Sequence, residues 1–325
     1  MLPKKLEKGD EVRVISPSMS MGIISDSVKN VAISRFSDMG LKISFGKHAF
    51  EMDEFESSNI RARIDDIHEA FMDSNVNAVI ASIGGFNSNQ LLHYIDYELI
   101  KSNPKIICGY SDITALISAI YKKTGIITYH GPSFSAFGML KGFDYTIEYF
   151  RKCLMSKNSF NISSSEEWSD DKWYEDQKNR TFIKNTGPLI INEGSAKGKL
   201  IGGNLCTFNL LHGTEYMPKL KGAIIFIEDD DITDINLFNR DLQSLIHQPG
   251  FDDIQGIIIG RFQKKSNITN DKIIKMIHKR KELLKIAIVA NMDFGHTFPM
   301  FTLPIGGIGK LEAINGSIHF EIIQH

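Results

Sequence analysis

Short apolar runs and amphipathic helical patterns alternate along roughly the first 150 residues. Five apolar runs have the length and composition of buried strands, at 12–16, 41–45, 78–83, 105–110 and 126–129. Patterns of helical period lie between them, at 28–36 (stopping near Gly40), at 60–71, from about Ser88, and at 112–122. This alternation predicts a parallel α/β sheet of Rossmann-like or flavodoxin-like type, with ligands at the carboxyl ends of its strands.

The periodicity fails between Cys153 and Gly187. Residues 163–180 form a polar run that carries six acidic side chains, which is typical of a linker or a lid. Beyond it the apolar pattern resumes with more β character and an amphipathic helix at 236–246. We therefore expect an N-terminal α/β domain at 1–152, a linker or lid at 153–185, and a smaller β-rich C-terminal domain at 186–325.

Composition narrows the class of protein. With 37 Lys and Arg against 39 Asp and Glu, the net charge of −2 argues against a partner that is a nucleic acid polymer. The three cysteines, Cys108, Cys153 and Cys206, are odd in number and far apart, which suits a reduced compartment. The charged N-terminus does not match a secretory signal, and no apolar run approaches the ~18 residues of a membrane span. We expect a cytoplasmic protein with no membrane partner.

The segment KIICGYSDITAL places a serine at a sharp transition from strand to helix. At such a turn the hydroxyl of Ser111 stands above the sheet edge, and the next backbone N–H can stabilise an oxyanion. Ile113 replaces the second glycine of the usual nucleophile elbow. The alternative is that Ser111 is a helix N-cap.

Two glycines follow the strand at 78–83, in IGGFNSNQ. Gly84 and Gly85 would let the backbone approach a ligand closely, and their N–H groups could form part of an oxyanion hole. A phosphate loop or a plain tight turn are the alternatives. The glycine pattern is incomplete for a dinucleotide fingerprint, which disfavours a nicotinamide enzyme.

An apolar strand at 224–227 runs directly into Glu228, Asp229, Asp230 and Asp231. Four adjacent acids suggest a metal site, but strand alternation sends neighbouring side chains to opposite faces and no paired histidines accompany them. The alternative is a solvated strand end.

Two histidines lie at strand ends. His296, in DFGHTFPM, is bordered by Phe294 and Phe298, so a fixed imidazole in a partly apolar environment is expected. His130, in TYHGPSF, has a similar position. A structural role is the alternative for each.

Taken in order, SIGGFNSNQLLHYIDYELIKSNPKIICGYSDITAL, YHGPSF, GKLIGGNLCTF, IFIEDDD and FGHTFPM resemble the serine peptidase family of LD-carboxypeptidases and microcin C immunity carboxypeptidases. The resemblance implies a Ser-Glu-His triad assembled across two domains, with Ser111 as nucleophile, His296 as general base and Glu228 orienting it. The N–H groups of Gly85 and Asp112 would hold the oxyanion. It implies no metal or cofactor, and a homodimer.

Two substrate classes compete within that family. Its LD-carboxypeptidases remove a terminal D-amino acid from a murein tetrapeptide, whereas its immunity enzymes cut an amide between a peptide's terminal aspartate and a modified nucleotide. The segment FNSNQLLHYIDYELI and the polar insert resemble the immunity branch. In that branch an aromatic residue of the insert stacks on adenine. Trp168 or Trp173 would take that role; the alternative is that both only anchor the linker. Gly84, Asn204 and His130 are further candidates for substrate contact. A binding protein without catalysis is the alternative from another class.

Overall fold

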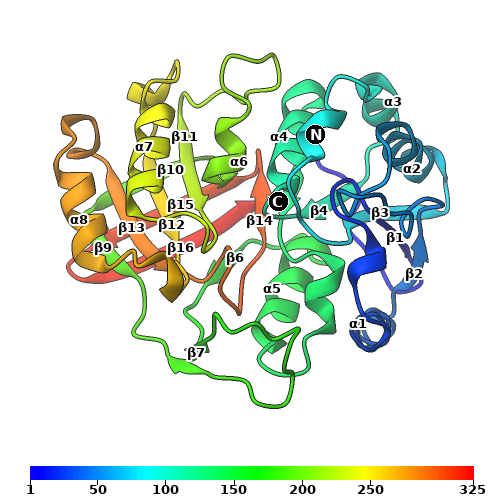
Figure 1. The fold of residues 1–325 in the computed structure, drawn as a ribbon. Helices are drawn as coiled ribbons and strands as arrows, with labels where there is room; N and C mark the ends of the chain where they lie inside the picture. The colour runs from blue at the N-terminus through cyan, green and yellow to red at the C-terminus, as the bar shows by residue number, and fades with distance from the viewer.

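The computed structural model describes residues 1–325 and contains two large β-sheets that lie side by side (Figure 1). The first sheet has six strands in the order β14-β5-β4-β3-β1-β2. Strands β1 to β5 run parallel and β14 is antiparallel to β5, which confirms the predicted parallel α/β sheet. The bounds are β1 (Glu11–Ile15), β2 (Lys42–Phe45), β3 (Val76–Ala81), β4 (Ile106–Gly109), β5 (Thr128–His130) and β14 (Leu303–Ile305).

Helices connect these strands. They are η1 (Met21–Ile23), α1 (Asp26–Asp38), α2 (Ile60–Met72), η2 (Ser88–Leu91), α3 (Tyr97–Ser102), α4 (Ile113–Thr124), η3 (Phe134–Gly138) and α5 (Asp144–Leu154). The helix predicted from about Ser88 is instead a short 3₁₀ turn, and α3 begins only where Asp96 caps the N–H of Leu99. No helix of the structure is both long enough and apolar enough to cross a membrane.

The second sheet has eight strands in the order β6-β16-β15-β10-β11-β12-β13-β9. Its bounds are β6 (Phe160–Ile162), β9 (Leu189–Asn192), β10 (Gly194–Asn204), β11 (Ala223–Glu228), β12 (Gly256–Gly260), β13 (Ala287–Met292), β15 (Ile308–Ile314) and β16 (Ser317–Gln324). Strands β10 to β13 are parallel, and every residue of β11 and β12 is buried, as expected for a sheet covered on both faces. The accompanying helices are α6 (Leu205–Asn209), α7 (Ile235–Ile246), η4 (Phe251–Asp253), η5 (Lys264–Ser266), α8 (Asn270–His278) and η6 (Lys281–Leu283).

Two strands cross between the predicted domains. β14 comes from the last third of the chain but pairs with β5 of the first sheet, and β6 from the predicted linker pairs with β16 of the second. Helix α4 contacts β4 and β5 on one side and β10 and α6 on the other, and its apolar residues are buried. One continuous cluster of 90 buried apolar residues therefore spans both halves, and the domain boundaries stay a prediction.

The polar insert is a strap held at several points. Strand β7 (Glu167–Trp168) pairs with β8 (Ile183–Lys184), and Arg180 donates to the carboxylate of Asp171 at 2.7 Å. Ser169 and Phe298 exchange two backbone hydrogen bonds, of 2.7 and 2.8 Å. Because Phe298 lies two residues beyond His296, these bonds attach the strap to the loop that carries this histidine.

Candidate active site

Three side chains from the ends of three strands meet between the two sheets. Ser111 follows β4, Glu228 is the last residue of β11, and His296 lies in the loop after β13. The hydroxyl of Ser111 lies 3.1 Å from Nε2 of His296, and Nδ1 of His296 lies 2.7 Å from Oε2 of Glu228. The parallel strands of both sheets thus deliver a serine, an imidazole and a carboxylate to one place.

Ser111 occupies a strained turn. Its φ of 61° lies in the left-handed region that residues with a side chain rarely adopt. Its hydroxyl bonds to His296 and to no N–H of α4, whose N-cap position is held by Asp112, so the alternative of a helix N-cap serine is wrong. A Cβ on Gly84 would stand 3.0 Å from the Ser111 hydroxyl oxygen, which explains why a glycine faces the serine.

Glu228 is fully buried. Burial alone would raise the pKa of its carboxyl group, but the charge and hydrogen bond of His296 outweigh burial and lower it. The alternative of a solvated strand end is therefore wrong for Glu228, and also for Asp229, which is 1% exposed. A buried carboxylate needs a partner, and here that partner comes from a distant segment of the chain.

His296 is held between Glu228 and Ser111. Burial favours its neutral ring, yet the charge and hydrogen bond of Glu228 raise the pKa to about 9. In the neutral ring, the proton on Nδ1 is donated to Glu228, and the free lone pair of Nε2 faces the hydroxyl of Ser111. The loop can approach closely because Gly295 has a φ of 101°, and a Cβ there would lie 2.6 Å from Oε2 of Glu228.

Two backbone amides beside Ser111 have no acceptor in the protein. These are the N–H groups of Gly85 and Asp112, the two predicted for an oxyanion. The Gly84–Gly85 turn packs against the nucleophile turn, since the Cβ position of Gly84 is also 3.7 Å from the Asp112 nitrogen. Free N–H donors at this place could stabilise negative charge on an atom attached to Ser111.

The side chain of Asp112 was not anticipated from the sequence. Its Oδ2 accepts hydrogen bonds from the Ser18 hydroxyl at 2.6 Å, the Ser88 amide at 2.8 Å and the Asn87 amide at 3.1 Å. The Ser88 hydroxyl in turn donates to the Asp112 carbonyl at 2.6 Å. This network, which we call the Asp112 clamp, fixes the glycine turn to the start of α4. No local pattern reveals it, because the partners are far apart in the chain.

The acidic side chains that follow Ile227 do not meet at one point. Asp229 accepts a hydrogen bond from Nδ2 of Asn204 at 3.2 Å, and burial together with Glu228 raises its pKa to about 7. Asp230 and Asp231 are partly exposed, and Lys265 pairs with Asp231 at 3.1 Å. No group of three or more His, Cys, Asp or Glu side chains has an arrangement that could hold a metal ion.

The remaining predicted substrate contacts differ in accessibility. Asn204 is 3% exposed, caps α6 through its Oδ1, and lies opposite Glu228 in the register of β10 and β11. Trp173 is buried, whereas Trp168 is partly exposed with the Arg261 guanidinium 5.1 Å from its ring centre.

His130 does not reach the site surface. It is fully buried beside Tyr110, Phe226 and Phe294, neither ring nitrogen has a partner, and burial lowers its pKa to about 4. The prediction that His130 contacts the substrate is therefore wrong, because the second sheet covers the end of β5.

Comparison with known sequences gives consistent matches over the chain. The profile of the LD-carboxypeptidase N-terminal domain matches residues 12–131, and that of the LD-carboxypeptidase C-terminal domain matches residues 197–311. YocD of Bacillus subtilis, named as a carboxypeptidase, is 54% identical over 100% of both chains. The microcin C7 self-immunity protein MccF of Escherichia coli is 32% identical over 94% of this chain and 91% of its own. A B. subtilis protein named as a murein peptide carboxypeptidase is 29% identical over 94% of this chain and 89% of its own.

Solved structures agree. An MccF-like protein from Bacillus anthracis superimposes with a TM-score of 0.99 at 51% identity, covering 100% of both chains. The microcin C7 self-immunity protein MccF in complex with aspartyl sulfamoyl adenosine superimposes with a TM-score of 0.90 at 30% identity, covering 100% of this chain and 99% of that one.

Proposed function

This chain belongs to the LD-carboxypeptidase family, and on that premise we propose that it is a serine-type carboxypeptidase whose catalytic residues are Ser111, His296 and Glu228. The observation that carries the proposal is the unbroken relay of hydrogen bonds from the Ser111 hydroxyl through His296 to Glu228. A serine hydroxyl is a weak nucleophile until a base removes its proton, and the base needs a third group to hold its tautomer.

The proposed reaction proceeds through an acyl-enzyme. Oγ of Ser111 attacks the carbonyl carbon of the scissile amide while Nε2 of His296 takes the hydroxyl proton. The amides of Gly85 and Asp112 receive the oxyanion of the tetrahedral intermediate. When the C–N bond breaks, His296 gives its proton to the leaving nitrogen, and water then attacks the ester by the same route to release the acid. Glu228 stays ionised throughout and stabilises the imidazolium.

The pH dependence of kcat/KM should report His296. The base works only when neutral, and its pKa is raised to about 9, so kcat/KM should rise with pH through that region and fall off on the acid side. Asp230→Asn removes one of the negative charges that raise this pKa and should move the midpoint to lower pH. Initial rates measured from pH 6 to 10 test both statements. A profile that is flat over this range would contradict the role of His296.

Asp112→Asn should lower kcat by roughly ten- to a hundredfold, because an amide accepts three donors less well than a carboxylate and the glycine turn loosens. The midpoint of the pH profile should stay in place, since His296 and Glu228 are untouched. A suitable control is Asp96→Asn, which also alters a carboxylate that accepts a backbone N–H but does so at the N-terminus of α3. Steady-state kinetics and thermal unfolding separate the two effects. Equal activity of both variants would remove Asp112 from the proposal.

For the substrate we propose an immunity-type amide, between a terminal residue of a peptide and a modified nucleotide. MccF, whose structure contains aspartyl sulfamoyl adenosine, covers almost the whole chain at close to a third identity. Two indoles on the strap, which is attached to the His296 loop, could stack on a purine. Of the two, Trp168 is the more exposed before substrate binds. The second candidate is a murein tetrapeptide, favoured by the relative named as a murein peptide carboxypeptidase.

A direct comparison of the two substrates decides between them. Purified protein is incubated with an aspartyl-nucleotide amide and, separately, with a murein tetrapeptide, and the released amine is quantified. We expect kcat/KM to be at least about a hundredfold higher for the nucleotide conjugate, and Trp168→Ala or Trp173→Ala to raise KM for that substrate alone. Preference for the tetrapeptide would establish the second candidate. Hydrolysis of neither, with binding retained, would favour a protein that binds without catalysis.

A further inference from the structure

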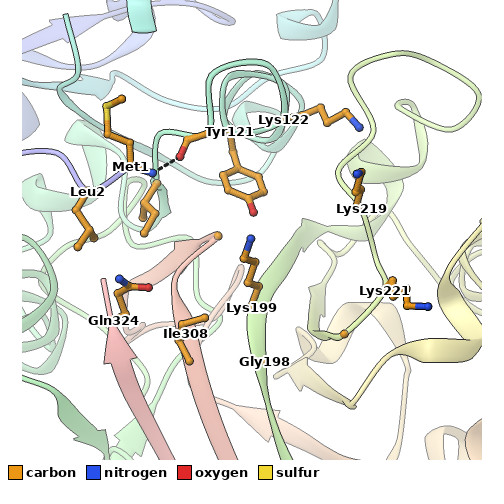
Figure 2. A pocket seen from close by; sticks show the side chains of 14 residues that line it. Met1, Leu2, Tyr121, Lys122, Gly198, Lys199, Lys219, Lys221, Ile308 and Gln324 are labelled. Atoms are coloured by element: carbon orange, nitrogen blue, oxygen red, sulfur yellow. Dashed lines mark hydrogen bonds between the residues drawn. The ribbon is translucent and has the colours of Figure 1, made fainter.

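A cavity of about 820 Å³ lies at the junction of the two sheets (Figure 2). One wall is the last turn of α4, with Tyr121 and Lys122, and the other is the second sheet, with Lys199 of β10 and Ile308 of β15. The loop that leads into β11 adds Lys219 and Lys221. The volume is in the range of cavities that hold metabolites.

The charged side chains that line this cavity are all positive. Its lining residues include four lysines and not one aspartate or glutamate. Lys221 pairs with Asp253 at 3.2 Å, whereas the side-chain amines of Lys122, Lys199 and Lys219 have neither an ion pair nor a hydrogen bond to the protein. Because the whole chain has a net charge of −2, its composition does not account for this excess of positive charge.

The side chains are arranged around a common space. Figure 2 shows the Lys199 amine directed toward the Tyr121 hydroxyl, with Lys122 and Lys219 on one flank and Lys221 pointing away. Lys122 also lies in the last turn of α4, where a helix dipole favours a cation. Lys199 and Lys219 are not at a helix C-terminus, so the helix dipole does not explain a positive charge at these two positions.

The cavity is separate from the catalytic site. On β10, Lys199 at the cavity lies five residues before Asn204, which is beside Glu228, and Gly222 at the cavity immediately precedes β11, which ends at Glu228. Five or six residues of extended strand correspond to about 20 Å. A molecule in this cavity would therefore not touch Ser111 or His296.

We propose that this cavity binds a small metabolite that carries at least two phosphate groups. Clustered ammonium groups repel one another, and a multivalent anion relieves that repulsion while receiving their hydrogen bonds. Lysine is a common phosphate ligand in proteins. Ile127, Ile308 and the ring of Tyr121 provide an apolar side on which an organic portion of the ligand can rest. The inference does not depend on the proposed hydrolytic function.

Titration calorimetry with inorganic pyrophosphate at about 0.1 M ionic strength tests the proposal. Wild-type protein should bind one equivalent saturably. The variant Lys199→Gln/Lys219→Gln should bind at least tenfold more weakly, since a charge-assisted hydrogen bond accounts for about that factor. The control Lys275→Gln/Lys285→Gln makes the same change in net charge on exposed lysines outside the cavity and should bind like wild type.

The outcomes separate a site from a general charge effect. Absence of saturable binding to wild-type protein, or equal weakening in the cavity and control variants, would overturn the proposal. If the double variant unfolds, Lys219→Gln alone, an exposed position, serves instead. Sedimentation of the same samples gives a further criterion: loss of a dimer in the cavity variant would mean that a second copy of the chain, rather than a phosphate metabolite, covers these lysines.

Discussion

Ser111→Ala should reduce amide hydrolysis by about 10⁴-fold or more, while the protein remains folded. The loss is large because the hydroxyl is the only group at this turn that can form the acyl-enzyme. The cost in folding free energy should be small, about 1 kcal/mol or less, because the side chain makes a single hydrogen bond, to His296. The measurement is kcat for the preferred substrate, alongside thermal unfolding.

A matched control lies seven residues further along the chain. Ser118 is a fully buried serine of α4 whose hydroxyl has no partner, so Ser118→Ala should retain full activity and stability. If Ser111→Ala kept more than about a tenth of wild-type turnover, another nucleophile would be at work. Intact binding without turnover by the wild type itself would instead point to a binding protein.

Glu228→Gln should lower kcat by about 10³- to 10⁴-fold. The amide that replaces the carboxylate can turn its NH₂ group toward Nδ1 of His296, which stabilises the wrong tautomer and leaves no base facing Ser111. It also removes the charge that raises the His296 pKa to about 9, so the midpoint of any residual activity should move to lower pH. Rates measured across pH with the variant and the wild type check both effects.

Glu228→Asp distinguishes charge from distance. It keeps the negative charge at a fully buried position but withdraws the carboxylate by one methylene, so it should retain more activity than Glu228→Gln and keep a raised midpoint. Activity of Glu228→Gln within about threefold of wild type would exclude Glu228 from the mechanism, whatever the geometry of the pair.

Much of the first sheet could be predicted from local pattern. The strands that became β1 to β5 are short apolar runs separated by helical periods, and each such signal is carried by neighbouring residues. The candidate triad was predicted in a different way, from resemblance to a known family. Ser111, Glu228 and His296 each lie at or just after the end of a strand, in a segment that carries this resemblance. Which strand ends meet in space is not a local property, and periodicity alone leaves it open.

The prediction and the alternative that failed, and the role that the sequence did not reveal, all depended on partners from elsewhere in the chain. The alternative of a solvated strand end failed for Glu228, because its buried carboxylate pairs with His296, which comes from another strand end. His130 looked like a substrate ligand because it ends a strand, but the second sheet covers it with Phe226 and Phe294. The carboxylate of Asp112 had no visible role because its donors lie near residues 18 and 88. In each case tertiary contact decided the outcome.

The late pairing of β14 with β5 has a consequence for how the chain is made (Figure 1). β5 ends at His130, yet its edge stays uncovered until residues 303–305 have been synthesised. An open edge is a template for pairing with other chains, so the nascent protein passes through a long period of vulnerability to aggregation. We therefore expect released chains truncated before residue 303 to engage chaperones, and chains of full length to be free of them.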